Sequence, residues 1–213
     1  MSPVDPNEIS LFRESEHLPA HYWQELLGLD PPEVCQRALV TFQPGTGFLI
    51  PFLNRLYVCR PEAKRIWRQD HPEKALSFQD CLVLLIYLQR AQERPLDGRK
   101  VSERELPGGE LFFRGPHALL REPLEKKFGR DPQGFLRAGL HLNGRDTGQG
   151  QASFELLVLP RIPVEYILYV EDEEFPAQIS ITFDRSISRH LPLDVIWALI
   201  NLTSRRLASL SKD

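Results

Sequence analysis

The stretch Val164–Asp184, which reads VEYILYVEDEEFPAQISITFD, decides the fold class of this chain. Its two arms are rich in β-branched and aromatic residues, as strands are, and the acidic run Glu171–Glu174 separates them. In the second arm Ile179, Ile181 and Phe183 alternate with polar residues, so one face of that strand is expected to pack and the other to meet solvent. The stretch therefore predicts an antiparallel hairpin with an acidic turn.

Other strand signals occur on the N-terminal side of this hairpin. Ser153–Leu159 predicts a third strand, because it is apolar and bounded by polar sequence. Thr41–Leu56 carries Pro and Gly between apolar runs and, with Arg55–Cys59, predicts a second hairpin. Pro51 predicts that its first arm is an edge strand or an irregular strand. Gly98–Phe113 predicts short strands around a glycine turn.

Two longer segments have the pattern of helices. Ser77–Arg94 begins with Ser and has Asp three residues later, and its middle, Cys81–Leu88, is apolar almost all round. Taken alone this middle also fits a buried strand, but the polar continuation Gln89–Arg94 favours a helix. Pro192–Ser211 predicts a C-terminal helix with a buried apolar stripe.

These elements predict an α+β fold in a single domain, with a mostly antiparallel sheet of hairpins packed against a buried central helix and a C-terminal helix. Residues 1–40 are expected to form an N-terminal helical segment of the same domain, with helices at Ala20–Leu27 and Pro32–Val40. Residues 41–213 form the α+β remainder.

Composition excludes several classes of function. A net charge of −3 over 213 residues gives no field that attracts nucleic acid. The longest apolar run, Cys81–Leu88, is too short for a membrane span, which needs roughly 20 residues. The first ten residues lack the features of a signal peptide, so we expect a cytoplasmic protein without membrane contact. Cys35, Cys59 and Cys81 form no CxxC pair, so neither a disulfide framework nor an iron–sulfur cluster is expected.

The acidic turn has two open interpretations. In the first it is a solvated turn, and Asp184, at the far end of the second strand, forms an ion pair with Arg161. In the second, Asp172 and Glu174 hold a hard cation through oxygen ligands or receive a basic partner protein. At roughly 3.3 Å per residue, a straight strand places Asp184 about 25 Å from Asp172. The two aspartates are therefore not expected to share an ion.

The histidines show no HxxxH or HxH spacing, so the sequence has no local zinc signature. A single axial ligand to a tetrapyrrole metal needs no such spacing, which leaves His117 and His190 as candidates beside ordinary surface or capping roles. The candidate ligand-binding residues are therefore Arg161, Asp184, His117 and His190. No GxSxG motif is present, and no catalytic residue can be assigned.

Four segments carry a resemblance to a known family: Leu84–Leu88, ELPGG at Glu105–Gly109, PLEKKFG at Pro123–Gly129 and, above all, Leu159–Asp184. The chain resembles the domain of unknown function family 3786 of bacteria and archaea, many of them anaerobes. Some relatives resemble fusions to an iron–sulfur domain of the type seen in corrinoid methyl-transfer proteins. The resemblance thus implies a link to corrinoid or one-carbon metabolism, although this chain lacks the Cys-rich cluster motif.

The leading hypothesis is a non-catalytic ligand-binding or accessory module. Its partner would be a small molecule, with a corrinoid or another tetrapyrrole as the implied cofactor class, or a protein. The alternative is a metal-assisted enzyme that uses the Asp172/Glu174 turn with a distant residue such as His190. A purely structural subunit is the third hypothesis, and it predicts a large exposed apolar patch.

Overall fold

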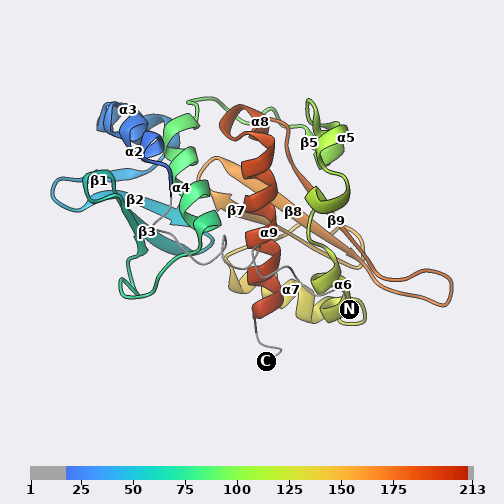
Figure 1. The fold of residues 1–213 in the computed structure, drawn as a ribbon. Helices are drawn as coiled ribbons and strands as arrows, with labels where there is room; N and C mark the ends of the chain where they lie inside the picture. The colour runs from blue at the N-terminus through green and yellow to red at the C-terminus, as the bar shows by residue number, and fades with distance from the viewer. Residues whose placement is uncertain (1–17, 211–213) are drawn as a thin grey trace. The chain divides into compact units, whose positions relative to one another are not determined.

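The computed structural model describes residues 18–210, and Figure 1 shows their helices and strands. The predicted α+β class is confirmed, because helices accompany two antiparallel sheets. The described chain divides into two compact units, one of residues 18–94 with 189–191 and one of residues 95–188 with 192–210. The beginning of the predicted N-terminal helical segment, residues 1–17, lies outside the described residues.

The first unit contains a four-stranded antiparallel sheet in the order β1-β2-β3-β4. Its strands are β1 (Thr41–Gln43), β2 (Gly47–Phe52), β3 (Arg55–Arg60) and β4 (Arg65–Arg68), with the short helix η2 (Pro61–Ala63) before β4. Pro51 predicted an edge strand or an irregular strand for this arm, and β2 lies inside the strand order rather than at an edge. The sheet accommodates Pro51 because β1 pairs only with residues 47–49 of β2. Pro51 therefore lies beyond the end of β1, where no backbone N–H is needed on that side.

The helices of the first unit are α2 (Ala20–Leu27), α3 (Pro31–Ala38) and α4 (Phe78–Arg90). The predicted buried helix is confirmed as α4. A capping box of Ser77 and Asp80 stabilises its N-terminus, and Val83–Leu88 are all buried. Two hydrogen bonds join it to its neighbours: the Tyr87 hydroxyl donates to the Ala38 carbonyl at 2.8 Å, and the Gln89 amide donates to the Tyr22 carbonyl at 2.5 Å.

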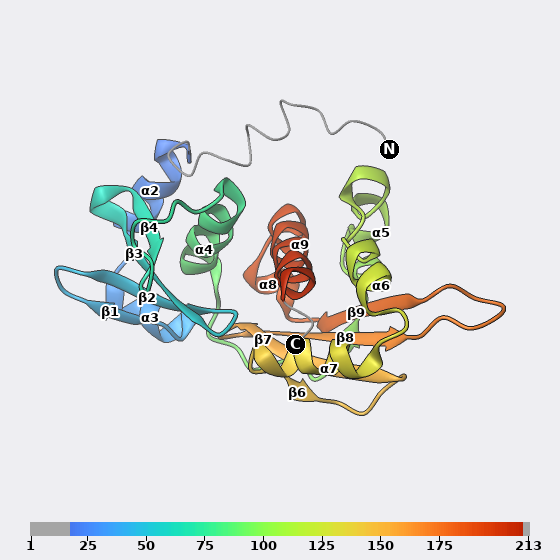
Figure 2. The same cartoon turned by 90° about the horizontal axis from the view of Figure 1, so that it is seen from below.

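The second unit contains a five-stranded antiparallel sheet in the order β5-β9-β8-β7-β6 (Figure 2). The predicted hairpin is confirmed as β8 and β9, whose register pairs Val164 with Phe183 at one end and Tyr169 with Gln178 at the other. The strands are β5 (Lys100–Val101), β6 (Arg145–Asp146), β7 (Ala152–Leu159), β8 (Ile162–Tyr169) and β9 (Gln178–Asp184).

One face of this sheet is apolar and carries helices. The Phe154 ring packs on Phe135 at 4.8 Å between ring centroids, and the Tyr166 hydroxyl lies 3.4 Å from the Ser204 hydroxyl. Gly139 sits directly on Phe154: a Cβ there would lie 2.2 Å from the ring, so only glycine permits this close helix–strand contact. The helices are α5 (Gly109–Phe112), α6 (Glu122–Phe128), α7 (Pro132–His141), α8 (Ile187–His190, whose last two residues belong to the first unit) and α9 (Leu193–Ser209).

The short strands predicted over Gly98–Phe113 are largely replaced by helical turns. Only β5 is a strand, and η3 (Glu103–Glu105) and α5 follow it, while η4 (Gly115–His117) comes next. A capping box of Ser102 and Glu105 explains the difference, since the Glu105 carboxylate accepts from the Ser102 backbone N–H at 2.8 Å. Within residues 18–210, no helix is both long and apolar enough to cross a bilayer.

Candidate functional site

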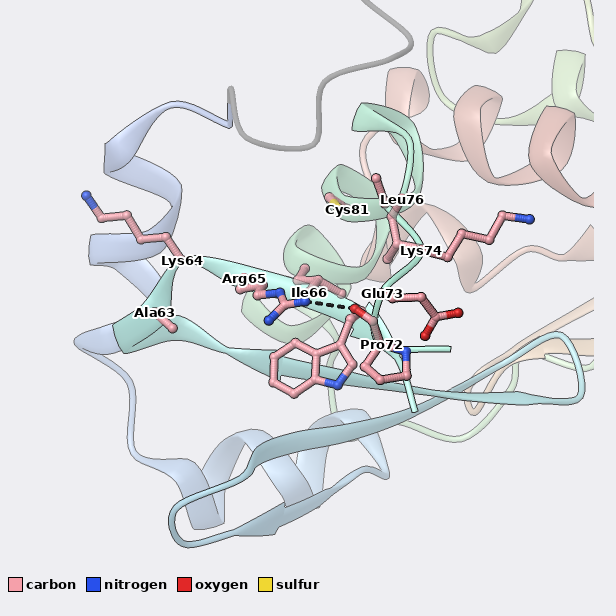
Figure 3. A pocket seen from close by; sticks show the side chains of 11 residues that line it. Ala63, Lys64, Arg65, Ile66, Pro72, Glu73, Lys74, Leu76 and Cys81 are labelled. Atoms are coloured by element: carbon pink, nitrogen blue, oxygen red, sulfur yellow. Dashed lines mark hydrogen bonds between the residues drawn. The ribbon is translucent and has the colours of Figure 1, made fainter. Parts of the chain in front are cut away.

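A cavity of about 430 Å³ opens in the first unit between β4 and residues 72–76 (Figure 3). Strand β4 is the outermost strand of its sheet, so this wall of the cavity is a sheet edge. The buried side chains of Ile66, Leu76 and Cys81 form its apolar part. Cysteine and aliphatic side chains make a hydrophobic floor, which is the usual base of a small-molecule site.

The sequence fixes both ends of the cavity wall by local interactions. At one end Lys64 adopts a left-handed conformation, with φ of 48°, and turns the chain from η2 into β4. At the other end the Arg68 guanidinium holds the Asp70 carboxylate with two bonds, of 2.9 and 2.6 Å. The His71 backbone N–H donates to the Arg68 carbonyl at 3.3 Å. These contacts place residues 72–76 beside β4.

The rim of the cavity is mainly cationic. Lys64, Arg65 and Lys74 line it, whereas Glu73 is the one lining residue with a negative charge. Figure 3 shows the two lysine side chains extending on opposite sides, and the Arg65 guanidinium donating across the space to the Pro72 carbonyl, at 2.7 Å. Such an excess of positive groups favours an anionic ligand.

Arg65 is held in place by a second contact. Its guanidinium lies 5.2 Å from the centre of the Trp67 ring, in a cation–π arrangement. A guanidinium has five N–H donors, so several remain for a carboxylate or phosphate after the bond to Pro72. Arg65 is thus a cation of the cavity lining whose position is set by two contacts.

Cys81, at the floor of the cavity, is a protonated thiol. Burial, with a smaller contribution from Asp80, raises the pKa of the Cys81 thiol to about 12. Burial also raises the pKa of Cys59, which pairs with Ile66 across β3 and β4, well above its usual value. At neutral pH both side chains are protonated thiols and not thiolates, so neither is an activated nucleophile.

Sequence reasoning missed this site. The run from Arg60 to Lys74, RPEAKRIWRQDHPEK, contains five Lys and Arg residues and one tryptophan, and that composition was the available signal. The cations have no regular spacing, however, and the cavity exists only because the turn at Arg68–His71 folds the run back on itself.

The acidic turn between β8 and β9 is organised by its own backbone. The Asp172 carboxylate accepts from the backbone N–H groups of Glu174, at 2.9 Å, and of Phe175, at 2.8 Å, and these bonds lower its pKa. The Glu171 carboxylate pairs with Arg130. Among residues 18–210 no group of three or more His, Cys, Asp or Glu side chains is arranged to hold a metal ion. Metal binding by Asp172 and Glu174 stays a prediction.

Asp184 lies at the opposite end of β9, as predicted, where the register brings it near the beginning of β8. Its carboxylate accepts from the backbone N–H groups of Asp97, Gly98 and Ser186, at 2.9, 2.8 and 2.9 Å. Burial alone would raise the pKa of Asp184, but the bonds from Ser186, Asp97 and Gly98 outweigh it and lower the pKa. The predicted ion pair with Arg161 is not among the described contacts of this carboxylate.

The two candidate histidines belong to different units. His117 is exposed, and its ring stacks on Phe112 at 4.6 Å and meets Trp197 edge-on at 5.8 Å. His190 is 1% exposed, and its Nδ1 accepts from the Gln92 backbone N–H at 3.1 Å. A tetrapyrrole role for either residue stays a prediction.

A second polar cluster, also missed from the sequence, lies on the other face of the second unit's sheet. Glu165 is 2% exposed, and its carboxylate lies 2.9 Å from the Lys100 ammonium. The Gln149 amide and the Thr182 hydroxyl each donate to it at 3.1 Å. Burial favours a higher pKa for Glu165, but Lys100 and the hydrogen bonds lower it, so the group stays ionised at neutral pH. The cluster is internally satisfied.

The fold and the cavity define an α+β protein with two antiparallel sheets and a cation-rimmed cavity at a sheet edge. The chain belongs to the family described as "Domain of unknown function (DUF3786)", whose model matches residues 30–206. The predicted family resemblance is thereby confirmed. Comparisons with curated proteins and with solved structures found no match.

Proposed function

We propose that this chain is a binding module for a small anionic molecule, which it takes into the cavity beside β4. The observation that carries the proposal is the charge of the lining, which contains three cations, Lys64, Arg65 and Lys74, and a single acid, Glu73. The volume of about 430 Å³ lies within the range of ligand sites, roughly 300–1,000 Å³.

The arrangement suggests which parts of a ligand would be recognised. Arg65, fixed by Pro72 and Trp67, offers a planar fork that suits a carboxylate or phosphate. Lys64 and Lys74 add positive charge from either side. The apolar floor around Ile66 and Leu76 accepts an uncharged portion, so an anion joined to a compact apolar or planar group fits better than an inorganic ion alone.

The proposed metabolic link is a separate part of the function. The family resemblance suggests corrinoid or one-carbon metabolism, in which folates join the carboxylates of a glutamate tail to a planar pterin ring. A folate therefore has the chemistry that the cavity favours, whereas a corrinoid would need one of the candidate histidines, His117 or His190, to reach its metal. Titration with both classes separates these alternatives.

The test is isothermal titration of the purified chain with citrate, inorganic pyrophosphate, folic acid and hydroxocobalamin. We expect at least one of the first three to bind, and the variant R65Q/K74Q to weaken it at least about tenfold, or about 1.4 kcal/mol. The matched control is R90Q, because Arg90 is an exposed cation of the same unit that lies outside the cavity. Absence of heat with every probe, or equal affinity in R65Q/K74Q and wild type, would refute the proposal.

A further inference from the structure

The acidic turn of the second unit presents two carboxylates and an aromatic ring. Glu173 and Glu174 are exposed, and Phe175 is 65% exposed. Neither glutamate side chain has an ion-pair partner within residues 18–210. Figures 1 and 2 both show the loop between β8 and β9 extending beyond the strands that it joins. An exposed phenylalanine beside unpaired acids is therefore available to another molecule.

This turn is ordered before any partner arrives. The Asp172 backbone N–H donates to the Phe175 carbonyl at 3.0 Å, and the Asp172 carboxylate accepts two N–H groups from within the turn. The base of the loop is fixed to α6's end, since the Glu171 backbone N–H donates to the Gly129 carbonyl at 3.1 Å. A segment that is already ordered loses less conformational entropy on binding.

The cavity beside β4 complements this turn in charge and in polarity. Its rim supplies Lys64, Arg65 and Lys74 for the two carboxylates. Its floor, formed by Ile66 and Leu76 with the neutral Cys81 thiol, supplies an apolar surface for a phenyl ring. The turn carries acids next to an aromatic ring, and the cavity carries cations next to an apolar floor, so the two surfaces are complementary.

We propose that the Glu173–Phe175 turn of one copy of the chain binds in the cavity beside β4 of a second copy. The inference rests on the proposed function, since it uses the same cations, and it names an acidic turn of this chain as a ligand of the site. The contact joins two different surfaces, so it is head-to-tail: each copy offers one turn and one cavity. Because the rim charges are exposed, the association weakens as salt is raised.

Two neutral variants separate the two surfaces. E173Q/E174Q removes the charge of the turn and leaves the cavity intact, while R65Q/K74Q does the opposite. In sedimentation velocity, the wild type is expected to increase in mass with concentration, and each variant alone to remain monomeric. A mixture of the two variants is expected to form a dimer and nothing larger, since only one turn–cavity pair remains functional. R90Q is the control and behaves as wild type.

A synthetic peptide of residues 170–177, VEDEEFPA, tests the contact directly. It is expected to bind the full chain, to bind R65Q/K74Q at least tenfold more weakly, and to be displaced by whichever of citrate, pyrophosphate and folic acid binds. A wild type that stays monomeric at all concentrations, or an E173Q/E174Q variant that associates like wild type, overturns the inference. If the small anions still bind in an R65-dependent manner in that case, the proposed function stands and only the self-association fails; if neither anions nor peptide bind, both fail.

Discussion

The Glu165 carboxylate and the Lys100 ammonium form an ion pair of 2.9 Å in which the acid is almost fully buried and the lysine side chain is 42% exposed. The pair joins β8 to β5, a strand of two residues at the edge of the sheet. β5 has only two ladder partners, Asp184 and Phe183, so this ion pair adds a side-chain link between the edge strand and the interior of the sheet.

Replacing Lys100 by Met should leave Glu165 buried without its cation. Removal of one partner of a buried pair costs about 3–5 kcal/mol, and the exposure of Lys100 reduces the expected loss to about 1–3 kcal/mol of unfolding free energy at pH 7. Urea unfolding of wild type and K100M measures it, and the double variant K100M/E165Q, which removes the stranded charge, should recover part of the loss.

The contribution of Glu165 to the free energy of unfolding should change with pH in opposite directions in K100M and in the wild type. In the wild type the pKa of Glu165 is lowered from 4.5, so its contribution to stability is present above that value and is lost as the pH falls through the lower folded-state pKa. In K100M burial acts without Lys100, and the pKa of Glu165 rises instead. The stability difference between K100M and wild type should therefore shrink as the pH falls below neutral, and a difference independent of pH would contradict this account.

Asp184→Ala should destabilise the second unit by removing a shared acceptor. Three backbone N–H groups, those of Asp97, Gly98 and Ser186, lose their bonds to one carboxylate. Hydrogen bonds to charged groups are worth about 1.5–3 kcal/mol each, and water can reach part of this site, so the expected loss is about 2–4 kcal/mol. Thermal unfolding followed by circular dichroism gives the value. D194N, an exposed acid at the start of α9, serves as the control and should change stability little.

Gly139→Ala should destabilise the chain through a steric conflict with Phe154. The added methyl would lie 2.2 Å from a fully buried ring, and overpacking of this kind costs about 1–3 kcal/mol even though alanine is the better helix former. Gly28→Ala is the matched control, since the nearest atom to its added methyl is at 3.5 Å. Equal denaturation midpoints for the two variants would show that α7 can move away from β7 without loss.

Local patterns predicted the longer elements well. The alternation of Ile179, Ile181 and Phe183 gave the β8–β9 hairpin, and the apolar middle of Ser77–Arg94 gave α4, because in both cases burial follows a regular period along the chain. The same reasoning was wrong for much of Gly98–Phe113, where the Ser102–Glu105 capping box makes a helical turn. A short segment has too few periods for its pattern to outweigh one local hydrogen bond.

The Lys100–Glu165 pair and the cavity beside β4 show which features local sequence predicts and which depend on the tertiary structure. By itself the sequence determined the fold class, the family and the acidic turn, since each depends on residues that are neighbours along the chain or on one strand. Only the tertiary structure decided that Lys100 meets Glu165 and that Arg65 faces residues 72–76 across a cavity. Such contacts depend on strand order and on the path of a turn, which bring together side chains whose separation in sequence carries no period.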